Sequence, residues 1–308
     1  MPPSLSKNGA LAQLLAEYRG REIVALLNRG NRGDGVIHLG GRQFFSSIGL
    51  APREFHETDD LSQMRGDVLL VYGAGAMSRG THSLPRRLRT IAPRFSEIVF
   101  LPSSFDVTEP AVRSFVQTWD RKYSVFCREL VSFDALRKVG AKPKVLLLGH
   151  DLAFHLDVSE WASRPAAGRA GLFRHDNEAA YGRLPHDLDV IEDASHGSDA
   201  EPEKLLDFVA RFAEIHTDRC HGAITAAMMG RKVTFYRNNY FKNRAIYDHS
   251  LAAMPQVRFV NHTPFSFAQF TRAIYWSRMR PVEMKVRRVF QGKPRPSRPS
   301  SSVRYEPR

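Results

Sequence analysis

The stretch EIHTDRCHGAITAAMMGRKVTFYR, residues 214–237, decides the fold class. A short strand pattern over 214–218 is followed by a small-residue helical pattern that begins at Arg219, and a largely apolar run occupies 232–237. Short continuous apolar runs are typical of strands buried on both faces of a parallel sheet, and a helix is the usual crossover between such strands. The stretch therefore predicts a β–α–β unit.

The same alternation continues along most of the chain. Before the quoted stretch, strand patterns lie at 22–28, 67–73, 97–103, 124–129 and 144–151, with helical patterns near 36–48, from Leu84, near 109–119 and near 132–139. On either side of the quoted stretch, strand patterns lie at 171–176 and 187–193, and helical patterns lie near 201–213, 243–253 and 265–279. Alternating strands and helices predict an α/β fold with parallel sheets.

Small residues gather between positions 159 and 171, and the strand pattern starts again after them. We interpret this segment as a linker between an N-terminal α/β domain over 1–163 and a C-terminal α/β domain over 164–280. Two such domains that face each other enclose a cleft, and open parallel sheets bind ligands beyond the carboxyl ends of their strands. We therefore expect the functional residues in the loops that follow the strands.

The chain has 308 residues, 43% of them hydrophobic, and a net charge of +13. Residues 281–308 hold eight Lys or Arg against two Glu, and Pro and Ser are frequent there. We expect this basic tail to be disordered, and either to contact anionic lipid headgroups or to be merely solvated. Because the chain shows no nucleic-acid recognition motif, we predict no nucleic-acid partner.

The sequence also bears on location and on metals. The amino terminus lacks the apolar core of a signal peptide, and no later apolar run reaches the roughly 18 residues that a membrane span needs. Cys127 and Cys220 form neither a disulfide framework nor a zinc pattern, and the histidines do not repeat at metal-ligand spacing. We predict a cytoplasmic protein without a metal, with the basic tail as its one segment suited to the inner face of the membrane.

Arg219 and His221 stand where the strand over 214–218 gives way to the helix. The first amides of a helix have no partner within it and attract anions, so an arginine and a histidine in this turn favour a phosphate or a carboxylate as ligand. The alternative is a surface arginine beside a capping histidine. At such an exposed helix start, Arg219→Ala is expected to leave the fold intact.

Glycine-rich loops follow the first two predicted strands. The loop NRGNRGD places Asn28, Asn31 and Asp34 beside glycines that let the backbone approach a ligand closely, although a plain turn explains it equally well. The second loop, YGAGAMSRG, has glycines that do not match the G-x-G-x-x-G spacing. This mismatch excludes a nicotinamide cofactor.

Two further strand ends carry polar groups. FCRELVS brings Arg128 to a strand end and Ser132 to the next helix start, which indicates either a ligand contact or an exposed arginine with a helix cap. LFRHDNEA gathers charges that we interpret as a solvated run, with Arg174 retained as a candidate substrate contact. A serine nucleophile elbow is absent from the sequence.

Taken in order, several of these motifs resemble the polysaccharide pyruvyl transferases. They are NRGNRGD, GAGAMSRG, LPSS, FCRELVSFDAL, GHDLAF and TDRCHGAITAAMMGRKVTFYRNNYFKN, and they run from about residue 28 to about residue 255. The most specific part is the block of arginine, any residue, histidine and glycine that begins at Arg219. This sequence departs from the family at Cys220, where leucine is common, and in LPSS and the second glycine-rich loop, which puts the acceptor more in question than the donor.

The resemblance implies two Rossmann-like domains in a GT-B-like arrangement. It also implies transfer of pyruvate from phosphoenolpyruvate to sugar hydroxyls as a ketal, with phosphoenolpyruvate as donor substrate and no further cofactor. Arg219 is then expected to bind the donor phosphate and Arg128 to be a second anion clamp, because arginine offers directional donors to both anionic groups.

For the remaining chemistry the resemblance implies three roles. His221 would donate a proton as the enol phosphate is protonated or as phosphate departs. Asp34 would act as a base for the attacking hydroxyl, and Lys242 would be an anion contact. Ser132, Asn31 and Arg174 complete the predicted substrate contacts. The acceptor sugar, its linkage to lipid and the oligomeric state stay open.

Two other functions compete with pyruvyl transfer. A glycosyltransferase of the same architecture would use a nucleotide sugar, and fold alone does not exclude it. A non-catalytic protein that binds anions or a membrane surface through its basic face is the third candidate.

Overall fold

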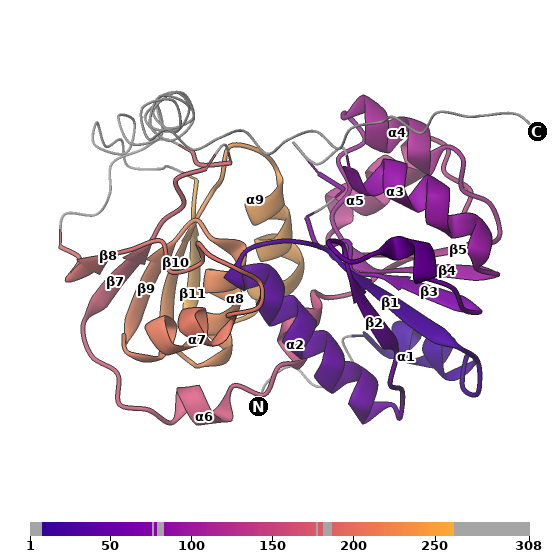
Figure 1. The fold of residues 1–308 in the computed structure, drawn as a ribbon. Coiled ribbons are helices and arrows are strands. Elements are labelled where there is room, and N and C mark those ends of the chain that lie inside the picture. The colour runs from indigo at the N-terminus through magenta and orange to yellow at the C-terminus, as the bar shows by residue number, and fades with distance from the viewer. Residues whose placement is uncertain (1–7, 76, 79–82, 177, 181–186, 262–308) are drawn as a thin grey trace, which may run out of the picture.

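The computed structural model describes residues 8–261 with the exception of 76, 79–82, 177 and 181–186. Within these residues the chain forms two parallel sheets side by side, each with helices on its faces (Figure 1). The first sheet ends at Leu148 and the second begins at Arg169, so the predicted boundary at residue 163 falls between them. The predicted helix near 265–279 and the basic tail lie outside the described residues.

The N-terminal sheet has six parallel strands in the order β2-β1-β3-β4-β5-β6. Its strands are β1 (Ile23–Leu27), β2 (Arg53–His56), β3 (Val68–Val71), β4 (Glu97–Ser103), β5 (Tyr123–Cys127) and β6 (Val145–Leu148). All five predicted strands are present. The sixth strand, β2, has no apolar run to predict it, because its polar sequence REFH lies partly exposed at the sheet edge.

The helices of this domain are α1 (Gly9–Ala16), α2 (Arg32–Ser47), α3 (Ser83–Ile91), α4 (Pro110–Val116) and α5 (Leu130–Lys138), with short helices η2 (Leu61–Gln63), η3 (Ala92–Arg94) and η4 (Leu152–His155). Helix α2 begins four residues before the predicted start because a capping box ends the glycine-rich loop. Asn31 Oδ1 accepts from the Gly33 amide at 2.8 Å, and Asp34 Oδ2 accepts from the Asn31 amide at 2.9 Å.

The C-terminal sheet has five parallel strands in the order β11-β10-β9-β7-β8. They are β7 (Arg169–Leu172), β8 (Val190–Ile191), β9 (Glu214–Thr217), β10 (Lys232–Tyr236) and β11 (Val257–Val260). The helices are α6 (Ser159–Ala162), α7 (Glu203–Ala210), α8 (Cys220–Met228) and α9 (Lys242–Ile246), which continues as the π-helix η5 (Tyr247–Leu251). The predicted linker thus contains α6 and the start of β7.

Both sheets share one topology. Numbered within each domain, the strand order is 2-1-3-4-5, and the first sheet adds a sixth strand beyond the fifth. In this doubly wound order the crossovers change direction between strands 1 and 3, and the crevice beyond the carboxyl ends of those two strands is the general ligand site. These crevices lie between β1 and β3 in the first domain and between β7 and β9 in the second.

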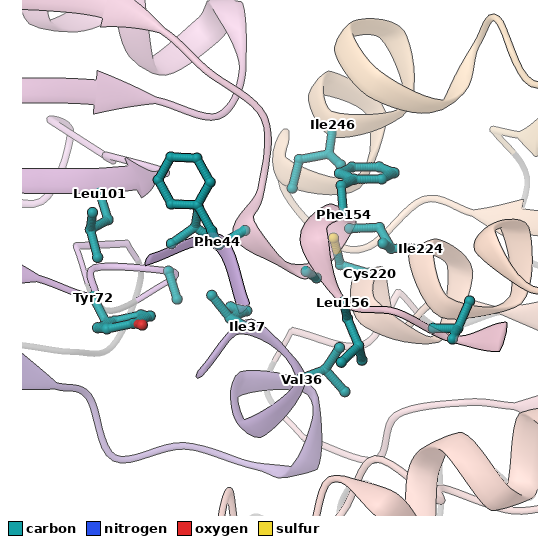
Figure 2. Packing of buried hydrophobic residues seen from close by; sticks show 14 of the residues in the cluster. Val36, Ile37, Phe44, Tyr72, Leu101, Phe154, Leu156, Cys220, Ile224 and Ile246 are labelled. Atoms are coloured by element: carbon teal, nitrogen blue, oxygen red, sulfur yellow. The ribbon is translucent and has the colours of Figure 1, made fainter. Parts of the chain in front are cut away.

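One hydrophobic cluster joins the two domains. It contains buried residues of both sheets and of helices α2, η4, α7 and α8. Figure 2 shows Phe154 of η4 beside Ile224 of α8 and Ile246 of α9, with Phe44 of α2 on the side of the first sheet. Helix α2 packs on both η4 and α8, so it lies in the domain interface, as Figure 1 shows. A second cluster, under α3 and α4, belongs to the first domain alone.

Within the part of the chain that the structure describes, no helix combines the length and the apolar character required to cross a bilayer.

Candidate functional site

A pocket of about 150 Å³ lies between the two domains. Its lining comes from the loops after β1, β3 and β5 of the first sheet and after β7, β9 and β10 of the second, so it joins the ligand crevices of both sheets. Five cationic side chains and two carboxylates line it, the cations being Arg29, Arg128, Arg174, Arg219 and Lys242. This lining favours an anionic ligand.

Arg219 is buried, lines the pocket and is hydrogen-bonded to two aspartates. Nε and Nη2 donate to the two carboxylate oxygens of Asp193 at 2.9 and 2.5 Å, and Nη1 donates to Asp176 Oδ2 at 2.9 Å. The bidentate pair fixes the plane of the guanidinium. Because a guanidinium has five N–H groups and the described residues engage three of them, two remain for a ligand.

The charged segment after β7 is not a solvated run, contrary to the sequence-based interpretation. Arg174 is 7% exposed, and its guanidinium contacts Asp176 at 2.7 Å and Glu178 at 2.5 Å. Lys242, from the start of α9, donates to Glu178 Oε2 at 2.6 Å. Burial alone would raise the pKa of Glu178, but Lys242 and Arg174 outweigh it and lower the pKa to about 2. These charges are therefore neutralised by ion pairs, one of them with Lys242 far along the sequence, and not by water.

Arg128 is also fully buried, and Asp151 after β6 holds it. Its Nε donates to Ser104 Oγ at 2.9 Å and its Nη1 to Asp151 Oδ2 at 2.6 Å, which leaves Nη2 without a hydrogen-bond partner within the described residues. Burial would raise the pKa of Asp151, yet the neighbouring His221 and Arg128 hold that pKa below its ordinary value. Asp151 is therefore a carboxylate between a guanidinium and an imidazole.

His221 lies in the first turn of α8 and lines the pocket. Its Nε2 is 3.5 Å from Asp151 Oδ2, which is long for a hydrogen bond but within reach of an ion pair. This nitrogen is buried and makes no hydrogen bond to any described residue. Among the described residues no side chain caps α8, so its first amides, beside Cys220 and His221, are available to an anion.

Comparison with known proteins agrees with this geometry. Residues 31–240, which span the capping box of α2, Arg128, Asp151 and His221, match the family model of the polysaccharide pyruvyl transferases. The chain belongs to this family. No curated protein matches the sequence.

A solved structure shares the fold of this pyruvyl transferase family member. It is an uncharacterized protein from Klebsiella pneumoniae subsp. pneumoniae NTUH-K2044, 24% identical in sequence, with a TM-score of 0.68. The similarity covers 84% of this chain and 100% of that chain. It is a likeness of fold.

The structure of this pyruvyl transferase family member brings seven of the eight predicted site residues to one pocket. They are Asn31, Asp34, Arg128, Arg174, Arg219, His221 and Lys242. Ser132 is the exception and corrects the prediction. It is fully buried outside the pocket lining, where its hydroxyl accepts from the Phe105 amide at 2.7 Å and its amide donates to Glu129 at 2.9 Å. Ser132 thus ties the start of α5 to the loop after β4.

Cys220, the family departure noted in the sequence, lines the same pocket. Burial raises the pKa of its thiol to about 11, with nearby Arg128 opposing that shift. The side chain is therefore a neutral thiol at physiological pH and not an activated nucleophile. Among the described residues, no group of three or more His, Cys, Asp or Glu could hold a metal ion.

Sequence reasoning missed the carboxylates that hold the cations. Asp151, Glu178 and Asp193 follow β6, β7 and β8, and each accepts from a pocket cation. The signal that could have found them is their position, because each lies shortly after the carboxyl end of a strand. Arg29, after β1, was missed as well; its exposed guanidinium lines the pocket and has no partner among the described residues.

Proposed function

We propose that this chain transfers the pyruvyl group of phosphoenolpyruvate to hydroxyls of a sugar in a polysaccharide or its precursor, forming a ketal and releasing phosphate. The family concerns pyruvyl transfer to polysaccharide. The single observation that carries the choice of donor is the cationic pocket, which is built from both ligand crevices and is of a size for a small anion.

Phosphoenolpyruvate presents two anionic groups, and the pocket offers two sets of donors. In the proposal, the phosphate lies against Arg219 and the first amides of α8. The carboxylate lies beside Gly75, where Arg128 Nη2 and Lys242 Nζ converge. A methyl group built on Gly75 would be 3.9 Å from the first nitrogen and 4.0 Å from the second. Both cations therefore border one small space.

The proton transfers are assigned to His221 and Asp34. His221 gives a proton to the methylene carbon of the enol phosphate, a sugar oxygen bonds to the adjacent carbon, and a second sugar oxygen displaces phosphate from that carbon. The two hydroxyl protons balance the step: Asp34 takes the proton of the first hydroxyl and passes it to the departing phosphate, and the proton of the second hydroxyl returns to His221. Asp151 supports the charged imidazole from 3.5 Å.

Asp34 is the candidate base for the first sugar hydroxyl. It lines the pocket, and its Oδ2 is engaged by the Asn31 amide at 2.9 Å. From the residues that the structure describes, its Oδ1 receives only a weak bond, from Asn28 Nδ2 at 3.4 Å, so that oxygen retains acceptor capacity for a hydroxyl.

The deciding experiment follows phosphate release from phosphoenolpyruvate with a panel of sugar acceptors, with transfer of labelled pyruvyl carbon to the glycan as second readout. We expect phosphate and labelled glycan in equal amounts, and neither product without an acceptor. Release of a nucleoside diphosphate from a sugar nucleotide by the same preparation, without turnover of phosphoenolpyruvate, would overturn the proposal in favour of glycosyl transfer.

A further inference from the structure

A second and larger pocket, of about 520 Å³, lies beside the cationic one. The same three segments line both. The end of β1 contributes Leu27 to the larger pocket and Asn28 to the smaller. Helix α2 contributes its first turn to the smaller pocket and the following turns to the larger, and the loop over 195–203 borders both. The two pockets are therefore neighbours along one face of α2.

The chemistry of the larger pocket is opposite to that of its neighbour. Four carboxylates line it against one guanidinium, Arg42. That guanidinium is already bound to Glu54 through contacts of 2.6 to 3.0 Å. An anion would meet repulsion here, so a second phosphoenolpyruvate or a nucleotide is a poor occupant.

Hydrogen-bonding groups converge from both domains on this pocket. His56 at the end of β2 contacts Asp199 Oδ2 through Nε2 at 2.8 Å, and His38 Nδ1 lies 3.9 Å from the same oxygen. Burial lowers the pKa of His38 to about 4, so its imidazole is neutral at physiological pH. Glu203 makes no hydrogen bond or ion pair within the described residues, and Leu39 and Pro202 add apolar surface.

We propose that this pocket binds a neutral sugar ring of the acceptor glycan, next to the ring that receives the pyruvyl group. Carboxylates and the neutral imidazole of His38 are partners for hydroxyl groups, and Leu39 and Pro202 suit the C–H face of a ring. The volume lies within the range of small-molecule sites. His38 is one helical turn, about 5.4 Å, beyond Asp34 of the cationic pocket, and its Nε2 is 3.5 Å from Asn28 Oδ1.

This inference rests on the proposed function for the name of its ligand, but its test does not need turnover. Imidazole signals of His38, His56 and His221 are assigned by single substitution and followed by NMR during two titrations. One uses phosphoenolpyruvate, and the other uses neutral methyl glycosides of glucose, galactose, mannose and N-acetylglucosamine together with their disaccharides. We expect at least one glycoside to shift the His38 and His56 signals, and phosphoenolpyruvate to shift His221.

The matched variants are Ala200→Trp, which fills the larger pocket from an exposed position, and Ala253→Trp, an exposed alanine outside it. Ala200→Trp should weaken glycoside binding by about tenfold or more and leave the shift of His221 by phosphoenolpyruvate unchanged, whereas Ala253→Trp should change neither. A panel that shifts neither His38 nor His56, or a response of these residues to phosphoenolpyruvate alone, would overturn the inference. Glycoside shifts without a His221 response would leave the sugar pocket standing and contradict the donor proposal.

Discussion

Arg219 is a buried cation held by two aspartates, so its removal should affect the fold as well as the ligand. We expect Arg219→Ala to abolish donor binding and to lower the free energy of unfolding by about 3–5 kcal/mol, because the buried carboxylate of Asp193 would lose the guanidinium with which it pairs. The sequence alone predicts an exposed helix start and an intact fold. Urea unfolding checks the difference, with Arg164→Ala, whose ion pairs are exposed, as the control. Wild-type stability in Arg219→Ala would contradict the structural role.

His221 combines access to the pocket with a ring nitrogen, Nε2, that makes no hydrogen bond to any described residue, which suits a proton donor. For His221→Asn we expect kcat to fall by about 10²- to 10⁴-fold while the KM for phosphoenolpyruvate changes much less, because asparagine can hydrogen-bond but cannot deliver a proton. Steady-state kinetics measure both values. The exposed His196 provides the matched substitution His196→Asn. A rise in KM with kcat unchanged would make His221 a binding group only.

Asp218 gives the stability of the protein a distinctive pH dependence. Burial raises its pKa to about 7, with Arg174 opposing the shift, against about 3.9 in an unfolded chain. Between these values the folded state binds the extra proton, so this group makes the free energy of unfolding fall as pH rises from about 4 to about 7. Asp218→Asn retains an oxygen for the Arg174 amide, which donates to Asp218 at 2.8 Å.

The expected result is a difference in slope. As pH rises from 5 to 7, the unfolding free energy of Asp218→Asn minus that of the wild type should increase by up to about 1.4 kcal/mol per pH unit, the value for one proton. Urea titrations at three pH values measure it. Parallel pH profiles for the two proteins would show that Asp218 is ionised in the folded state throughout this range.

At the scale of elements, the buried parallel strands were predictable, whereas the edge strands β2 and β11 were not. The apolar run over 97–103 predicts β4 with its bounds as the structure has them, because a strand buried on both faces must be apolar along its length. The edge strand β2 escapes this rule, since REFH is partly exposed. The start of α2 was missed because glycines at positions 33 and 35 lower helix propensity, and the Asn31–Asp34 capping box overrides them.

In the functional site, the positions of the cations were predictable from the sequence and their ion-pair partners were not. Strand-to-helix junctions with cations, such as Arg219 after β9 and Arg128 after β5, were predictable because the carboxyl ends of parallel strands form the ligand edge. Which carboxylate would hold which cation was not. Glu178 pairs with Lys242, 64 residues later, and Asp193 with Arg219, 26 residues later. Such pairs depend on the conformation of the loops after the strands, and the hydrophobic pattern of the sequence does not predict that conformation.

Helix α2 offers a test of close packing. A methyl group at Gly40 would lie 2.1 Å from the Leu152 carbonyl oxygen, whereas one at Gly9, the first residue of α1, meets nothing within 4 Å. We expect Gly40→Ala to lower the free energy of unfolding by about 1–3 kcal/mol, because backbone must move, and Gly9→Ala to leave it unchanged or slightly higher. Urea unfolding measures the free energy of unfolding of both variants, each of which adds one methyl group to a helix. A Gly40→Ala protein as stable as Gly9→Ala would show that α2 does not press on η4.

At the scale of the molecule, two domains with one topology place their ligand crevices face to face. Each sheet alone would offer an open edge with a few polar groups. Their opposition surrounds a small space with cations from both sides, while the carboxylates Asp151, Asp176 and Asp193 anchor those cations. The cleft was predictable from two α/β units. Its ligand was not, because the ligand depends on which side chains of the two domains face each other, and the sequence does not give the relative position of the domains.

The shared core predicts that the two domains unfold together. Phe154 is buried between elements of both, and α2 from the first domain packs on α8 of the second. We expect chemical unfolding to show one transition by both circular dichroism and tryptophan fluorescence, measured with Trp276 replaced by Phe so that the signal comes from Trp119 in the first domain and from Trp161, beside Asp207, on the second. Phe154→Ala should lower the free energy of unfolding by about 3–5 kcal/mol and shift the circular dichroism and fluorescence midpoints together, because Phe154 packs in the core that both sheets share. Saturating phosphoenolpyruvate should move both signals the opposite way, since it binds only where the domains meet. Two separate transitions in Phe154→Ala, only one of them displaced from its wild-type position, would mean that the domains are stable independently and that the pocket forms by docking.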